Sequence, residues 1–259
     1  MIELLESLVR GLGVGSAYAL IAIGFVIIYK STGVISFAQP ALMLAGAVAV
    51  SYLVPALVTV LPRTQAFVLA LLLGAVGVAV LALAIERLAI RPMVGRPVFV
   101  VAIITIGLDI AIRVVANGFI GLGARPIGDP WGLGRFSLGD LQVQWRHLVM
   151  MVTAVLVLAV LFWFFRYTRH GLAMRAAAFD QEAALTQGVS VGAVFALSWA
   201  MAGGLAAVGG ALLATGGGVD QQLWILALAA LPAIILGGLD SLGGAVVGGL
   251  TVGVVQSLV

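Results

Sequence analysis

Long apolar runs separated by short polar joints make up almost the whole chain. A helix needs about 20 apolar residues to cross a bilayer, and the runs that reach this length are 11–29, 40–61, 66–85, 98–116, 148–165 and 189–213. Two shorter, glycine-rich runs, 223–236 and 243–259, are typical of broken or re-entrant helices. The pattern predicts an all-α integral membrane protein, a polytopic helical bundle of about eight apolar segments.

Two short polar joints orient the predicted spans. Their arginines are Arg87, Arg91 and Arg96 in the joint 86–96, and Arg166, Arg169 and Arg175 in the joint 166–188. Because two spans separate the joints, both fall on one side of the membrane, which the positive-inside rule makes cytoplasmic. The N-terminus and the segment 118–146 then lie outside. With Lys30, seven basic residues lie inside and five outside.

Composition excludes a soluble fold. Hydrophobic residues make up 63% of the chain and charged residues 9%, whereas soluble domains carry about 25% charged residues. We expect a single transmembrane domain over residues 1–259, because no long polar stretch is available for a second. The absence of cysteine excludes disulfides and thiolate metal sites. A net charge of +3 suits loops at a lipid bilayer and predicts no nucleic-acid partner.

The two ends of the chain give weaker signals. The first residues are acidic, where a secretory signal is basic, so we expect no cleavage. The chain stops at Val259 inside an apolar run. We expect a final cytoplasmic tail to be missing.

Two pairs of segments resemble each other within the chain. Residues 11–20 align with 188–197, and residues 38–46 align with 230–238, with Pro40 matched to Pro232. The partners run in opposite directions in the predicted topology. This is typical of inverted repeats, in which broken helices line a substrate path near the midplane. Chance coincidence in so apolar a chain is the alternative.

Asp109 and Arg113 lie four residues apart inside a predicted span, and hence on one helix face. Charges within a span usually mark function. The alternative is an ion pair near the outer end that only fixes packing. The segment 24–31 lacks the second glycine of a phosphate-binding loop, so we expect no nucleotide on this chain. We also see no serine–histidine–acid or two-carboxylate set and no metal-ligand cluster, so an enzyme is not expected.

Three stretches carry a family resemblance: 15–24 running on through 33–39, 168–177 with Glu182-Ala183-Ala184, and 233–249. Together they resemble the membrane permeases of ATP-binding-cassette importers for branched-chain amino acids, the hydrophobic amino acid uptake family. The likeness implies half of a pore that works by alternating access in the bacterial inner membrane. Implied partners are a second homologous permease, two cytosolic ATP-binding subunits and an extracytoplasmic substrate-binding protein. ATP would be bound by those partners, and no cofactor by this chain.

The resemblance also assigns roles to residues. A short helix predicted over 172–186 would dock on the ATP-binding subunits, unless it is a generic interfacial helix. The docking residues are Arg169, Arg175, Asp180, Glu182, Ala183, Ala184 and Gly188. We further hypothesise that the broken segments line the substrate path, and plain packing is the alternative for its two aromatic residues. The path residues are Tyr18, Ser36, Phe37, Gln39, Pro40, Pro232, Gly237 and Gly238.

The chain departs from the family pattern at the first stretch, which usually has asparagine before the phenylalanine and histidine-glycine after the alanine. Here Ser36, Gln39 and Pro40 occupy those positions. This leaves open a permease for amides, urea or another small polar solute. An ion-coupled secondary transporter that uses Asp109 is the rival of a different class, and a purely structural membrane subunit is a third reading.

Overall fold

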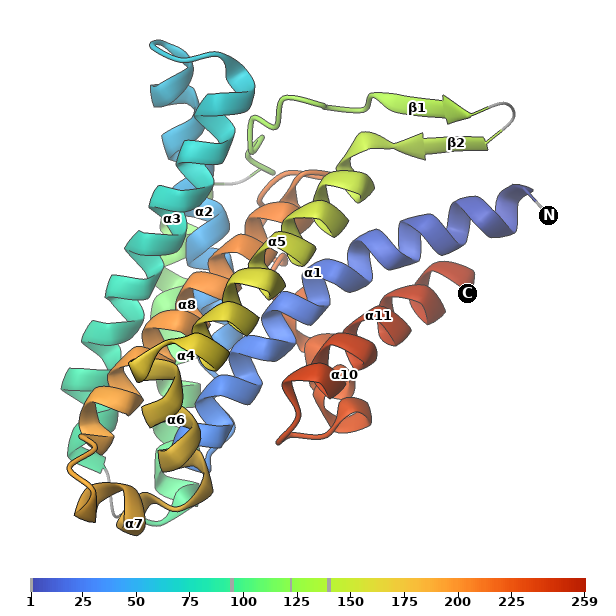
Figure 1. Ribbon diagram of the computed structural model, residues 1–259. Coiled ribbons are helices and arrows are strands. Elements are labelled where there is room, and N and C mark those ends of the chain that lie inside the picture. Colours follow the sequence, from blue (N-terminus) through green and yellow to red (C-terminus); the bar gives the residue numbers. More distant parts are fainter. Residues whose placement is uncertain (1, 94–95, 122, 139–140) are drawn as a thin grey trace.

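A computed structural model describes residues 2–93, 96–121, 123–138 and 141–259, and it is a bundle of helices (Figure 1). Within these described ranges, six helices are long and apolar enough to cross a membrane. They are α1 (Ile2–Thr32), α2 (Gln39–Val58), α3 (Arg63–Ile85), α4 (Val98–Ile120), α5 (Trp145–Tyr167) and α8 (Val191–Ala214). A π-helical turn η1 (Glu86–Ile90) and a 3₁₀ turn η2 (Arg91–Met93) continue α3. The predicted all-α membrane bundle and its six long spans are confirmed.

The two glycine-rich runs are the shorter apolar helices that the pattern predicts. The first divides into α9 (Ile225–Leu228) and α10 (Ala230–Gly237), and the second forms α11 (Leu242–Leu258). An antiparallel hairpin of β1 (Arg135–Leu138) and β2 (Leu141–Gln144) lies between α4 and α5 and was not predicted. It belongs to a polar segment without the apolar periodicity of a span.

Helix α1 lies at the centre of the bundle and is buried along most of its length, between α8 and α11. Its contact with α11 depends on small residues, because a Cβ added at Gly253 would collide with Gly15, and one at Gly249 with Ala19. Small residues let helix backbones approach closely where lipid gives no hydrophobic drive for association. The small residues of α11, among them Gly249 and Gly253, therefore form a packing surface against α1.

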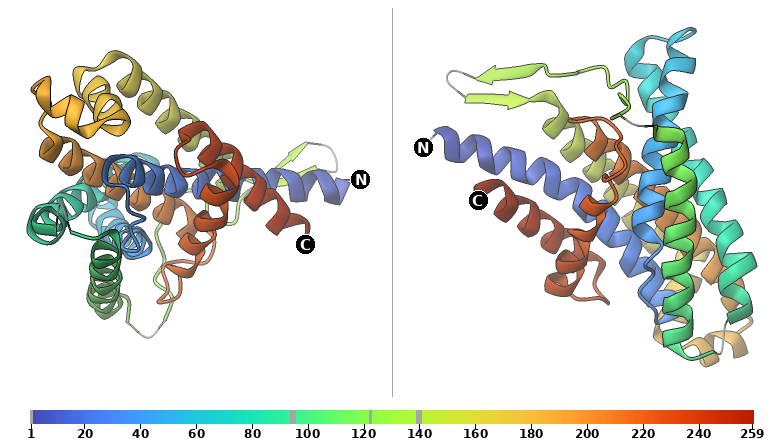
Figure 2. Two further views of the ribbon diagram at one scale, coloured as in Figure 1. Left: turned by 90° about the horizontal axis from the view of Figure 1, so that it is seen from below. Right: turned by 180° about the vertical axis from the view of Figure 1, so that it is seen from behind.

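The two polar joints lie at the same end of the bundle, as predicted. Figures 1 and 2 show η1, α6 (Arg169–Phe179) and α7 (Gln181–Thr186) at one end, and both termini with the hairpin towards the other. Gln181 Nε2 donates to the Ser31 carbonyl at 3.0 Å, which ties α7 to the end of α1. The positive-inside rule makes this end cytoplasmic.

The joint after α5 contains two helices, so the prediction of one helix over 172–186 is wrong. Asp180 has extended backbone angles (φ −153°, ψ 109°), and its Oδ1 accepts a hydrogen bond from the Ala183 N–H at 3.0 Å. An aspartate that caps a helix N-terminus satisfies a backbone donor that has no partner within the helix. Asp180 therefore ends α6 and begins α7.

One pair of the segments matched as an inverted repeat lies on helices that run in opposite directions, as such a repeat requires. Helices α1 and α8 cross the bundle in opposite senses, whereas α10 has only eight residues and does not cross it as α2 does (Figure 1). Pro40 and Pro232 both lie in the first turn of their helices. Proline is tolerated there because its missing N–H has no intrahelical partner. Both prolines therefore lie where a helix begins.

Candidate functional site

The irregular joint between α1 and α2 lies among the helices. Ser36 is 1% exposed and Gln39 is fully buried, whereas the Phe37 side chain is 38% exposed. The Phe37 N–H donates to Thr105 Oγ1 of α4 at 3.1 Å. Gly33 has a φ of +70°, which a residue with a side chain rarely adopts, so the chain can leave α1 and turn inward here.

Gln39 brings an amide to the centre of the bundle. Its Nε2 donates to the Ala202 carbonyl of α8 at 3.0 Å. A Cβ at Gly24 of α1 would collide with that same nitrogen. Within the described residues, Gln39 Oε1 and Ser36 Oγ are buried without a hydrogen-bond partner. The joint therefore places unused polar oxygens between helices that are otherwise apolar.

Helix α4 carries a polar stripe whose first member, Thr105, contacts this joint. Its members recur every fourth residue and so share one face: Thr105, Asp109, Arg113 and Asn117. Thr105 is 1% exposed and Asp109 is 7% exposed. Only the two charged residues had been predicted as a functional set. The four-residue spacing was the signal that would have found the other two.

The predicted ion pair of Asp109 and Arg113 is present, with Oδ2 and Nη2 2.6 Å apart. Asp109 lies at the midpoint of α4 and Arg113 one turn nearer its C-terminal end, and whether the pair acts in transport or only fixes packing stays a prediction. Asp109 lies close to the backbone amide of Ala41 in the first turn of α2. The Arg113 guanidinium lies 3.9 Å from the ring centroid of Trp224, which precedes α9. The pair thus brings α4 together with the first turn of α2 and the start of α9.

The atoms of this stripe are incompletely satisfied. Asp109 Oδ1, Arg113 Nε and Asn117 Oδ1 are buried without hydrogen-bond partners among the described residues. An unpartnered buried polar atom costs free energy, about 1–3 kcal/mol. Such atoms are expected where a water or a polar solute completes the set.

Other residues of the predicted path have different surroundings. The Tyr18 hydroxyl lies 2.9 Å from Gln256 Oε1 and belongs to the contact between α1 and α11. Gly237 packs against the backbone of Gly244, and Gly238 ends α10 with a φ of +89°. The structure therefore gathers Ser36, Phe37, Gln39 and Pro40 in one joint, and it places Tyr18 and Gly237 in contacts with α11. A role of Tyr18, Pro232, Gly237 and Gly238 in transport stays a prediction.

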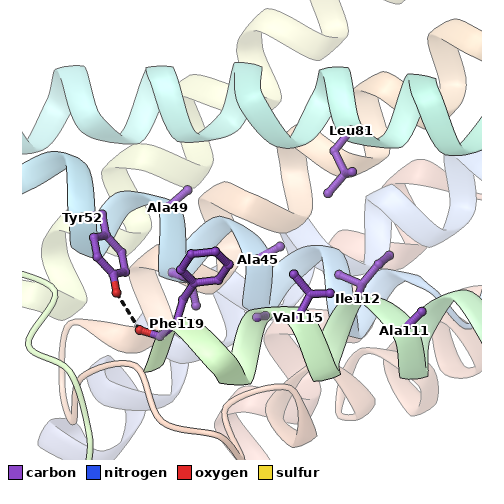
Figure 3. Close-up of a pocket in the computed structure, with 10 residues that line it drawn as sticks. Ala45, Ala49, Tyr52, Leu81, Ala111, Ile112, Val115 and Phe119 are labelled. Atoms are coloured by element: carbon purple, nitrogen blue, oxygen red, sulfur yellow. Dashed lines mark hydrogen bonds between the residues drawn. The ribbon is translucent and has the colours of Figure 1, made fainter. Parts of the chain in front are cut away.

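A cavity of about 540 Å³ lies between α2, α3 and α4 (Figure 3). Its walls are apolar side chains such as Ala45, Leu81 and Val115. The one hydroxyl in it, on Tyr52, donates to the Phe119 carbonyl at 2.8 Å. A charged solute would lose its hydration there without replacement, so this cavity does not suit such a solute.

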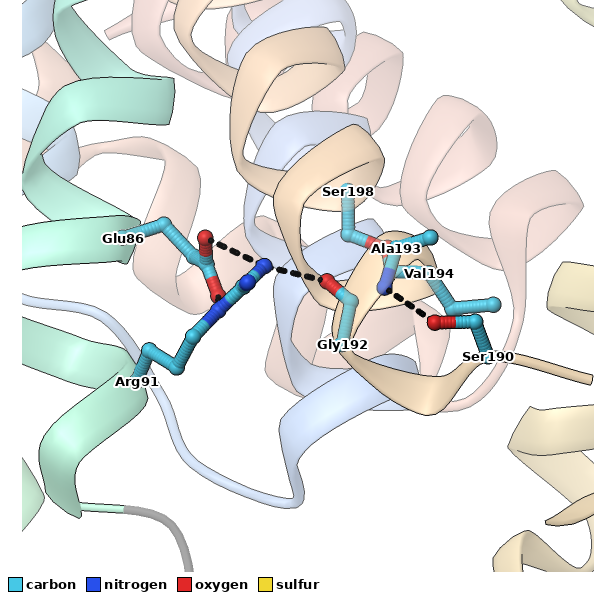
Figure 4. A network of polar contacts seen from close by, with 7 residues as sticks. All are labelled: Glu86, Arg91, Ser190, Gly192, Ala193, Val194 and Ser198. Atoms are coloured by element: carbon cyan, nitrogen blue, oxygen red, sulfur yellow. Dashed lines mark hydrogen bonds and ion pairs between the residues drawn. The ribbon is translucent and has the colours of Figure 1, made fainter.

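At the end of the bundle that is predicted to be cytoplasmic, a buried charge joins the end of α3 to α8 (Figure 4). The Glu86 side chain is fully buried and accepts two hydrogen bonds from Arg91, at 3.1 and 3.2 Å. Arg91 Nη2 also donates to the Gly192 carbonyl in the first turn of α8, at 2.8 Å. Because α8 directly follows α7, this network connects the end of α3 with the surface helices.

The predicted docking residues lie on those surface helices. Arg169, Arg175, Asp180, Glu182, Ala183 and Gly188 are exposed, whereas Ala184 is buried against the bundle. Apolar side chains project beside them, with Phe179 95% exposed and Leu172 60% exposed. This end of the protein therefore presents a mixed charged and apolar surface.

Comparison with known proteins identifies the family. Residues 7–259 match the family model described as branched-chain amino acid transport system / permease component. The chain is 31% identical to the high-affinity branched-chain amino acid transport system permease protein LivH of Escherichia coli, over 98% of this chain and 85% of LivH. It is 30% identical to the corresponding protein BraD of Pseudomonas aeruginosa, with the same coverage.

Among solved structures, one chain of PsaBC from Streptococcus pneumoniae in complex with Fab is similar to this protein. The alignment covers 96% of this chain and 79% of the PsaBC chain, with 14% sequence identity and a TM-score of 0.48. The full-length sequence match and the six apolar helices agree on a multi-pass protein of the inner membrane. The chain belongs to the family of branched-chain amino acid transport system permease components.

Proposed function

We propose that this chain is the permease subunit of an ATP-driven importer for branched-chain or related amino acids. The observation that carries the proposal is the family match over residues 7–259, which includes both the α1–α2 joint and the surface helices. The chain forms half of the pore, and a second homologous permease forms the other half. An extracytoplasmic binding protein delivers the substrate to the outer end.

The substrate passes beside the α1–α2 joint and the polar stripe of α4. The buried oxygens of Ser36 and Gln39 that lack partners among the described residues support this route. The pair of Asp109 and Arg113 supplies the charges at the same depth. Polar groups at broken helices suit a small polar solute, because they replace part of its hydration without a large charged pocket.

Two cytosolic ATP-binding subunits drive the cycle by pushing on α6 and α7, and ATP is hydrolysed on them. The exposed Phe179 and Glu182 support a partner surface here. The bond from Arg91 to the Gly192 carbonyl passes the movement from α8 to α3. Alternating access follows when these helices tilt around the joint.

The test is reconstitution of the chain with its co-purified partners in proteoliposomes that contain ATP. We expect leucine uptake that requires both ATP and the binding protein. Glu182→Ala should lower uptake several-fold, whereas Glu3→Ala, an exposed glutamate at the outer end, should not.

Two outcomes would overturn the proposal. Uptake driven by an ion gradient without ATP, and abolished by Asp109→Asn, would identify the secondary transporter. Uptake of urea or amides in place of leucine would reassign the substrate.

A further inference from the structure

The charged pair in α4 has a feature that a packing contact does not need. Asp109 and Arg113 use one atom each for each other, at 2.6 Å. Asp109 Oδ1 and Arg113 Nε remain buried and without partners among the described residues. A pair that served packing alone would gain from satisfying these atoms, because buried polar atoms are nearly always hydrogen-bonded.

We propose that the Asp109–Arg113 pair is the intramembrane binding site for a zwitterionic α-amino acid, whose ammonium group binds Asp109 and whose carboxylate binds Arg113. This inference rests on the proposed function and names the residues that recognise the substrate. The ammonium and carboxylate of an α-amino acid are attached to one carbon. The two protein groups lie one helical turn apart on one face of α4, within reach of such a compact ligand.

Charge balance explains why a zwitterion suits this site. The ion pair by itself is neutral overall, and it stays neutral when a zwitterion binds between its two groups. An uncompensated charge inside a membrane is costly, and removing one partner of a buried pair is strongly destabilising. An amine or a carboxylic acid would leave one protein charge without its counterion. The pair therefore selects against solutes with a single net charge.

The surroundings fit this division of roles. Asp109 lies close to the Ala41 amide at the N-terminus of α2, where a negative charge is favoured. The Arg113 guanidinium lies 3.9 Å from the ring centroid of Trp224. The indole ring therefore offers an aromatic surface beside the place where the substrate carboxylate would bind. Thr105 and Asn117 continue the stripe one turn away on either side, about 6 Å along the helix. These two side chains would provide polar contacts for the substrate before it reaches the Asp109–Arg113 pair and after it leaves.

The first experiment uses the double variant Asp109→Asn/Arg113→Gln in the reconstituted complex. Both replacement side chains are uncharged, so the variant leaves no uncompensated charge inside the membrane and should fold. We expect leucine transported per ATP hydrolysed to fall at least tenfold, while Arg125→Gln, an arginine on the outer loop, leaves this ratio unchanged. Because the ratio does not depend on the amount of folded complex, a merely structural role would not change it.

The second experiment tests charge selection directly. Binding of labelled leucine to the purified complex without its binding protein is challenged with isoamylamine, which lacks the carboxylate, and with 4-methylpentanoate, which lacks the ammonium. Unlabelled leucine should compete at least tenfold better than either. Equal competition, or a double variant with an unchanged transport ratio, would overturn the inference and leave the importer intact. A wild-type complex that transports no amino acid would overturn both.

Discussion

The buried charge of Glu86 gives a sharp prediction about stability. Replacing Arg91 by methionine, of similar length, leaves a fully buried carboxylate without its counterion and the Gly192 carbonyl without its donor. Removing one partner of a buried pair costs about 3–5 kcal/mol. We therefore expect the free energy of unfolding to fall by about 3 kcal/mol. At about 2–4 °C per kcal/mol, the melting temperature should fall by at least about 6 °C.

The reciprocal change should cost less. In Glu86→Gln the amide still accepts from Arg91, and the Arg91 side chain is 37% exposed, so water solvates its charge. We expect about 1 kcal/mol, the value of an ordinary hydrogen bond. The neighbouring Arg87 is exposed, and Arg87→Met should change stability by less than about 0.5 kcal/mol.

Thermal unfolding in a mild detergent measures all three changes. The decisive comparison is the double variant Glu86→Gln/Arg91→Met, in which no buried charge remains. It should be more stable than Arg91→Met alone, because the uncompensated carboxylate accounts for most of the loss. If the two single effects simply add, or if Arg87→Met is as damaging as Arg91→Met, the buried charge is not the cause and the reasoning fails.

Three further changes test other contacts. Asp180→Ala removes the cap of α7 and should cost about 1 kcal/mol of local helix stability, seen as faster amide exchange over α7 and weaker ATP-driven uptake. Gly253→Val should prevent α11 from packing on α1 and abolish folded protein in the membrane fraction, whereas Gly107→Ala, with open space around it, should leave yield unchanged. Tyr18→Phe removes the hydrogen bond to Gln256 and should cost about 1 kcal/mol in thermal unfolding with uptake unchanged.

Much of the site could have been predicted from local spacing. The four-residue recurrence from Thr105 to Asn117 places those side chains on one face before any tertiary structure is considered. The break between α6 and α7 is also local, because Asp180 competes with the helix by capping the next one. The alanine content of 172–186 favours one continuous helix, but the cap formed by Asp180 outweighs this propensity.

Apolar length was sufficient to determine the six spans, because it is a property of single segments in a bilayer. The distribution of arginines predicts their orientation. Only the tertiary structure placed Gln39 against Gly24 and Ala202, or Arg91 against Gly192. These contacts join residues that are distant in the chain. Their positions depend on how closely whole helices approach, and that approach is set by many small-residue contacts acting together.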